Sequence, residues 1–118
     1  MSPLLARAHA VLDELLFGLT LARPPLMLGL PPGEDPARVW AVSNRSGIFL
    51  SHRFATLSAA ALRALIAHEI GHHLLVRHGG RFNDEEGATL VGLALLDDPG
   101  AHAALVQEAR TPRARACA

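Results

Sequence analysis

The sequence has one cysteine, no tyrosine and no lysine among its 118 residues. Because a single thiol cannot form a disulfide within the chain, Cys117 predicts a fold without cross-links and a reducing, cytoplasmic setting. Eleven basic residues, all of them arginine, balance eleven acidic ones, so the formal net charge is zero. This balance produces no field that would attract nucleic acid or an anionic membrane, and we expect no direct nucleic-acid partner.

Long apolar runs are also missing. Arg7, Asp13 and Glu14 interrupt the leucine-rich segment near the N-terminus, and nowhere do about 18 uncharged apolar residues follow one another, as a membrane helix requires. We therefore expect neither a signal peptide nor a membrane span. Half of the residues are hydrophobic, which is enough for one domain over residues 1–118. Residues 110–118 are expected to form a flexible tail.

The N-terminal half combines one helix with a small hairpin. Apolar residues recur every three or four positions between Leu4 and Leu19, which predicts an amphipathic helix. Five prolines in residues 23–36 predict an irregular connection. The β-prone runs 39–42 and 48–50, separated by a short polar segment, predict a β-hairpin.

The C-terminal half is expected to be helical. A segment rich in Ala and Leu predicts a long central helix from a cap at Thr56 or Ser58 to about His78. Asn83 is the expected cap of a helix over residues 84–96, and a short last helix is expected over 101–109. The sequence thus predicts an α+β fold, mostly helical, with a small sheet beside the central helix.

The central helix carries His68-Glu69-Ile70-Gly71-His72, which has the spacing His-Glu-x-x-His. Two histidines four positions apart share one helical face, about 6 Å apart along the axis, so both imidazoles can bind one ion. Glu69 lies beside that ion and can accept a proton from a zinc-bound water. The motif predicts one Zn²⁺ per chain, with His68 and His72 as ligands and Glu69 as the general base.

A zinc peptidase needs a third protein ligand, and the sequence leaves three candidates. His78 has the spacing of the metzincin signature, but Leu75 stands where that signature has a helix-breaking Gly. If the chain reverses after the central helix, Glu85 and Glu86 at the start of the next helix come near the ion. Both remain open, with Glu86 preferred, although Glu86 also has capping-box spacing from Asn83.

The motif helix and the segment after it resemble a known family. His68-Glu69-Ile70-Gly71-His72-His73-Leu74-Leu75, followed by residues 84–96, is similar to the gluzincin zinc metallopeptidases, and most of all to the ImmA/IrrE-like family. The resemblance covers roughly residues 48–99. Matching the family's second segment, Glu-Ala-Asn-x-Phe-Ala-x-x-Leu-Leu, implies that Glu86 is the third ligand. The broader gluzincin form Glu-x-x-Ala instead matches Glu85 with Ala88.

The resemblance implies a minimal zincin-like domain and a function. A cytoplasmic zinc metalloendopeptidase would cleave a peptide bond in a protein partner, for which a regulatory repressor is the expected type. The alternative is a zincin-fold metal-binding module that is catalytically weak or inactive and acts by protein–protein interaction.

The sequence does not decide which residue stabilises the oxyanion or which strand, if any, pairs with the substrate. A cationic group should stabilise the oxyanion of the transition state. The residues considered for this role are His52, His73, His78 and Arg45. The strand expected at Ile48–Leu50 is considered either as a sheet edge that pairs with an extended substrate or as an ordinary core strand.

Overall fold

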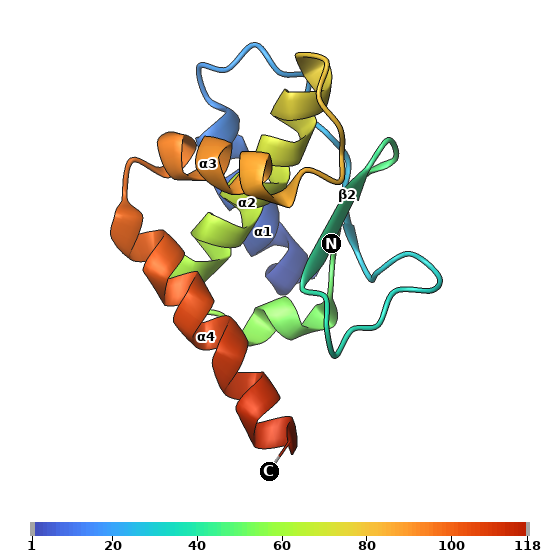
Figure 1. The fold of residues 1–118 in the computed structure, drawn as a ribbon, viewed down its shortest axis with the longest axis vertical. Helices are drawn as coiled ribbons and strands as arrows, with labels where there is room; N and C mark the ends of the chain where they lie inside the picture. The colour runs from blue at the N-terminus through green and yellow to red at the C-terminus, as the bar shows by residue number, and fades with distance from the viewer. Residues whose placement is uncertain (1, 118) are drawn as a thin grey trace.

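Helix α2 (Ala59–Arg77) lies at the centre of the computed structural model, which describes the backbone of residues 2–117 and the side chains of residues 2–109. Helix α2 contacts the other three α-helices and strand β2, and it lies between the helices and the sheet (Figure 1). The expected α+β class is confirmed. The remaining elements are α1 (Pro3–Leu16), β1 (Leu26–Leu28), β2 (Ala41–Asn44), β3 (Gly47–Leu50), the 3-10 helix η1 (His52–Thr56), α3 (Glu85–Leu96) and α4 (Pro99–Cys117).

The ends of α2 agree with the sequence. Ser58 is the N-cap, and its side chain accepts a hydrogen bond from the backbone N–H of Ala61. At the other end, Gly79 adopts a positive φ of 90°, which few residues other than glycine tolerate, and this lets the chain turn back. Between these ends the Ala- and Leu-rich segment buries its apolar side chains against its neighbours, so the motif sits on a rigid, central element.

The sheet has three strands in the order β1-β3-β2. The expected hairpin is present as the antiparallel pair β2 and β3. The irregular connection expected over residues 23–36 was wrong in part, because β1 lies within it and pairs in parallel with β3. Three residues are too few to show an alternating pattern, so this strand depends on its neighbour. As a result β3 is the central strand, so that of the two alternatives left open for residues 48–50 the structure shows the core strand and not the sheet edge.

Helices α2 and α3 approach closely because their contact consists of small residues. A side chain at Gly71 would place its Cβ 2.5 Å from the backbone oxygen of Ala88. One turn further along α3, a Cβ at Gly92 would lie 3.1 Å from the backbone of His68. This glycine contact holds the start of α3 next to the motif.

Replacing Gly71 by alanine is expected to separate the two helices. In an exposed helix this change would add up to about 1 kcal/mol of stability. Here the clash with the Ala88 carbonyl outweighs that gain, and we expect a net loss of about 1–3 kcal/mol. Urea unfolding measures the loss. Gly100→Ala, in the first turn of α4, meets only the flexible side chain of Asp98; it is the matched control and should show no loss of stability, with a gain of up to about 1 kcal/mol. Equal stability of both variants would contradict the close contact.

Helix α4 covers one side of α2 and is longer than expected. It continues past residue 109, where the sequence predicted its end, to Cys117, so the backbone of the expected tail is helical; the side chains from 110 on lie outside the described part. Glu108 anchors this helix, since its carboxylate accepts hydrogen bonds from the backbone and side chain of Ser58 at 2.7 and 2.6 Å. A negative charge at the N-terminus of α2 is favoured by the helix dipole.

None of the helices in the described residues combines the length and the apolar character needed to cross a membrane.

Candidate metal centre

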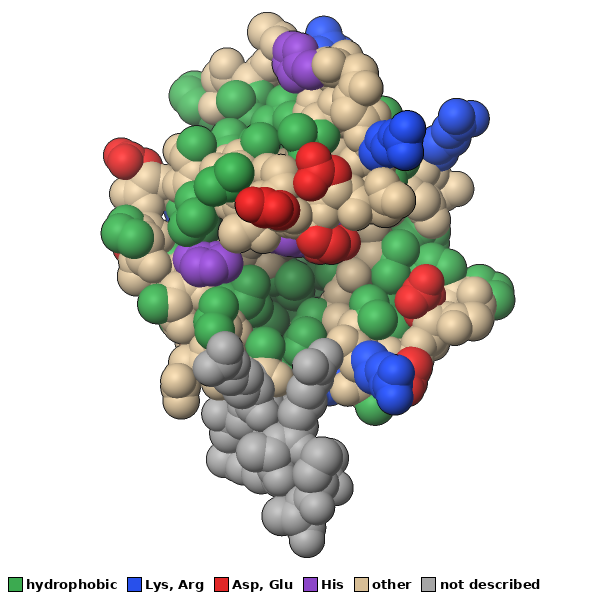
Figure 2. Space-filling view, viewed as in Figure 1, with side chains coloured by type: hydrophobic (Ala, Val, Ile, Leu, Met, Phe, Trp, Pro, Cys, Tyr) green, Lys and Arg blue, Asp and Glu red, His purple; other side chains and the backbone are tan. Residues whose placement is uncertain are grey.

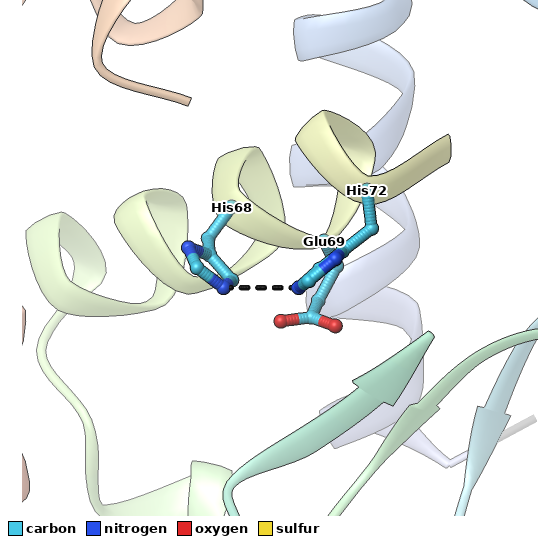
Figure 3. A group of neighbouring side chains, drawn as sticks. All are labelled: His68, Glu69 and His72. Atoms are coloured by element: carbon cyan, nitrogen blue, oxygen red, sulfur yellow. Dashed lines mark hydrogen bonds between the residues drawn. The ribbon is translucent and has the colours of Figure 1, made fainter. Parts of the chain in front are cut away.

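Three side chains from α2 and α3 converge on one point. The Nε2 atoms of His68 and His72 lie 3.1 Å apart, as helical spacing predicts (Figure 3). The two carboxylate oxygens of Glu85 divide between them, with Oε2 2.8 Å from His68 Nε2 and Oε1 3.4 Å from His72 Nε2. Two imidazole nitrogens and a carboxylate therefore face one another from two helices.

The structure places Glu85, and not the predicted Glu86, beside the imidazoles. The physical reason is the cap of α3: Asp84, rather than the expected Asn83, accepts the hydrogen bond from the backbone N–H of Gly87. Helix α3 therefore begins at Glu85. This residue lies on the same face as Ala88, three positions on, which packs against α2. Glu86 is exposed and points about 100° away around the helix.

The other candidate ligand, His78, is not brought to this point. It is the C-cap residue of α2 and is exposed. Its backbone N–H bonds to the carbonyl oxygens of the last turn of the helix, so the helix runs unbroken through Leu75. The bend that a metzincin-type third histidine requires does not occur.

Glu69 is buried beside the imidazoles, with 3% of its surface exposed. One possible metal-ligand atom from each of His68, Glu69 and His72 lies within 4.8 Å of the other two. The hydroxyl of Ser43, on β2, donates a hydrogen bond to Glu69 Oε1 at 2.9 Å and so orients the carboxyl group. Burial raises the pKa of Glu69 to about 8, the Ser43 hydrogen bond opposes this rise, and the charge of Glu85 adds to it. Without a cation nearby, Glu69 is mainly protonated at neutral pH.

This raised pKa predicts that Glu69 destabilises the metal-free fold. Between pH 4.5 and about 8 the carboxyl group is ionised in the unfolded chain but protonated in the folded one, so stability falls as pH rises through this range. Glu69→Gln removes the effect and should stabilise the metal-free protein at pH 7 by roughly 2–3 kcal/mol. Chemical unfolding of both proteins at pH 4.5, 6 and 8 measures the difference. A difference that does not grow with pH would contradict the buried acid.

Burial favours the neutral form of His72 and His73. Burial lowers the pKa of His72, against the opposing charge of Glu85. A neutral imidazole is the form that binds metal. The ring nitrogen Nδ1 of His72 is buried without a hydrogen bond of normal geometry. The backbone of Phe82 nevertheless lies close enough to this ring to raise its pKa, against the effect of burial. Burial also lowers the pKa of His73, whose Nε2 lies 3.3 Å from the carbonyl oxygen of Gly47, at the turn of the hairpin.

A cleft of about 610 Å³ opens beside the imidazoles. Figure 2 shows a hollow with an apolar interior beneath a group of acidic side chains and a histidine. Its lining comes from α2, α3, α4, β2, the segment before β2 and the connection between α2 and α3. The residues on the walls are Glu34, Arg38, Val39, Trp40, Ala41, Val42, Ser43, Leu65, Phe82, Thr89, His102, Leu105, Val106 and Ala109, together with His68, Glu69, His72 and Glu85.

None of the residues considered for the oxyanion lines this cleft. His52, His78 and Arg45 are exposed elsewhere, and His73 contacts the hairpin turn. The side chains of its lining that can carry a positive charge, besides the motif histidines, are Arg38 and His102.

Sequence reasoning missed Ser43, Thr89 and His102. Ser43 and His102 join the site through contacts between distant elements, for which a single sequence carries no signal. Thr89 had one usable signal, because it lies four positions after Glu85 and thus on the same helical face.

Comparison of the chain with protein-family models, with curated proteins and with solved structures finds no match. The function is therefore argued from the geometry of the site.

Proposed function

We propose that this protein is a zinc-dependent metallopeptidase, in which His68, His72 and Glu85 hold the ion and Glu69 is the general base. The observation that carries the proposal is the convergence of the two motif imidazoles and the Glu85 carboxylate beside a buried acid, at the wall of a cleft. The third ligand is Glu85 because its oxygens, and not those of Glu86, face the histidines.

The donor set fits zinc. Ligand atoms around a tetrahedral zinc ion lie about 3.3 Å from one another. The two histidine Nε2 atoms are 3.1 Å apart, and they lie 2.8 and 3.4 Å from the two different carboxylate oxygens of Glu85. Two neutral imidazoles with one carboxylate suit Zn²⁺ better than the oxygen-seeking Mg²⁺ or Ca²⁺. Three protein ligands leave a fourth position open, as catalytic zinc sites require.

The residues around the ion have separate tasks. The ion would supply Lewis acidity, which polarises the peptide carbonyl and acidifies water. Glu69 takes the proton of the attacking water and delivers it to the departing amine. Ser43 keeps the carboxyl group aimed into the cleft. Arg38 and His102 are the groups of the cleft wall that can stabilise the oxyanion.

The substrate is proposed to be a peptide segment in extended form. Strand β2 forms an edge of the described sheet, and its residues Ala41, Val42 and Ser43 line the cleft. A peptide that pairs with this edge by backbone hydrogen bonds would pass beside Glu69. Residues 48–50, which the sequence left open for this role, cannot serve because β3 is already paired on both sides. A regulatory protein in the cytoplasm remains the proposed source of the peptide.

Metal analysis tests the proposal first. Mass spectrometry of the untagged protein should find about one zinc per chain, and His72→Ala should lose it. His9→Ala, remote from the site on α1, is the control and should retain the metal. A wild-type protein that takes up no zinc even when it is supplied would overturn the proposal.

A further inference from the structure

Thr89, on α3, lies between two of the proposed zinc ligands. Its Oγ1 is 3.0 Å from the backbone carbonyl oxygen of Glu85, one turn earlier in the same helix. The same Oγ1 is 3.3 Å from Nδ1 of His68, on α2. One hydroxyl group therefore connects a residue of each helix, behind the point where their side chains converge.

The direction of these two hydrogen bonds follows from proton counting. A hydroxyl has one proton to donate, and the backbone carbonyl of Glu85 can only accept. The Thr89 proton therefore goes to Glu85, and Oγ1 is left as an acceptor. A hydrogen bond to His68 then requires that Nδ1 carry a proton and donate it.

This arrangement determines what His68 presents to the site. A neutral imidazole with its proton on Nδ1 has a lone pair on Nε2. That Nε2 faces His72 Nε2 at 3.1 Å and a Glu85 oxygen at 2.8 Å. Electron-rich atoms at these distances repel one another unless a cation lies between them. Thr89 thus holds His68 in the tautomer that needs a metal ion.

We propose that Thr89 is the positioning residue of the metal centre, which sets the tautomer and ring orientation of His68 and ties it to the backbone of Glu85. This inference rests on the proposed zinc site. Outer hydrogen bonds of this type raise metal affinity because the ligand is already oriented before the ion arrives. The corresponding Nδ1 of His72 has no such partner of normal geometry, so Thr89 acts on one imidazole of the pair.

Two substitutions in the full-length protein test the proposal. Thr89→Val keeps the shape but removes the hydroxyl, and it should weaken zinc binding roughly 10–100-fold in a chelator competition. Thr89→Ser keeps the hydroxyl and should bind zinc within about threefold of the wild type. Thr56→Val is the matched control, since it also loses a hydroxyl-to-carbonyl hydrogen bond, on η1 away from the site. Its zinc affinity should be unchanged.

Nuclear magnetic resonance provides a second readout, and its wild-type measurement does not depend on how the variants fold. In the zinc-loaded wild type, the His68 ring should show a slowly exchanging proton on Nδ1, and this protection should be lost in Thr89→Val. Wild-type affinity in Thr89→Val, equal weakening in the Val and Ser variants, or a His68 ring bound through Nδ1 would each overturn the role of Thr89. A wild type that binds zinc but cleaves no peptide leaves this role intact and overturns only the peptidase, whereas no zinc binding overturns both.

Discussion

Glu69→Gln is expected to reduce peptide cleavage at least about 100-fold while zinc remains bound, because general-base catalysis contributes 10²–10⁴-fold. Glutamine has nearly the same shape and still accepts the hydrogen bond from Ser43, so the site keeps its geometry. It cannot take a proton from water. Hydrolysis of a degenerate peptide library, followed by mass spectrometry with parallel zinc analysis, measures both quantities.

The design separates catalysis from docking. Glu86→Gln makes the same chemical change at an exposed position, and it should leave cleavage within about twofold of the wild type, as surface substitutions usually do. A Glu69→Gln protein that cleaves at the wild-type rate would exclude Glu69 as the base. A wild type that binds zinc without cleaving any peptide, and a Glu69→Gln variant that retains the biological function, would instead support the metal-binding module that acts through protein–protein interaction.

Glu85→Ala is expected to weaken zinc binding by about 100-fold or more, since it removes one of three protein ligands. Glu86→Ala should leave the affinity within about threefold, because outer electrostatics at an exposed site contribute little. Chelator competition on both variants measures the dissociation constants. The pair is closely matched, because both are exposed acids in the first turn of α3, where each interacts with the same helix dipole.

The opposite ranking would identify Glu86 as the ligand. It would mean that α3 is rotated by one residue when zinc binds, with Asn83 as the cap in place of Asp84. Equal and small effects of both substitutions would mean that neither acid binds the ion. Both outcomes would contradict the site described here, in which the oxygens of Glu85 divide between the two imidazoles.

Much of the fold was predictable because its signals are local. The cap at Ser58, the apolar segment that follows it and the glycines after His78 define α2 almost to the residue. The hairpin was predictable for the same reason. The strand at Leu26–Leu28 was not, since it forms only where β3 offers a partner. The central place of β3, and the edge position of β2 beside the cleft, follow from that missed strand.

The site, like the fold, has parts that local sequence signals predict and parts that depend on contacts between distant elements. The sequence by itself determined that His68 and His72 converge with Glu69 beside them, because helical geometry places residues one turn apart on one face. Only the tertiary structure decided between Glu85 and Glu86, which are adjacent in sequence but face different directions. That choice depends on the rotation of α3 about its axis, which the Asp84 cap and the contact of Gly71 with Ala88 determine. Ser43 and Thr89 also join the site through packing between elements, and no local pattern encodes such contacts.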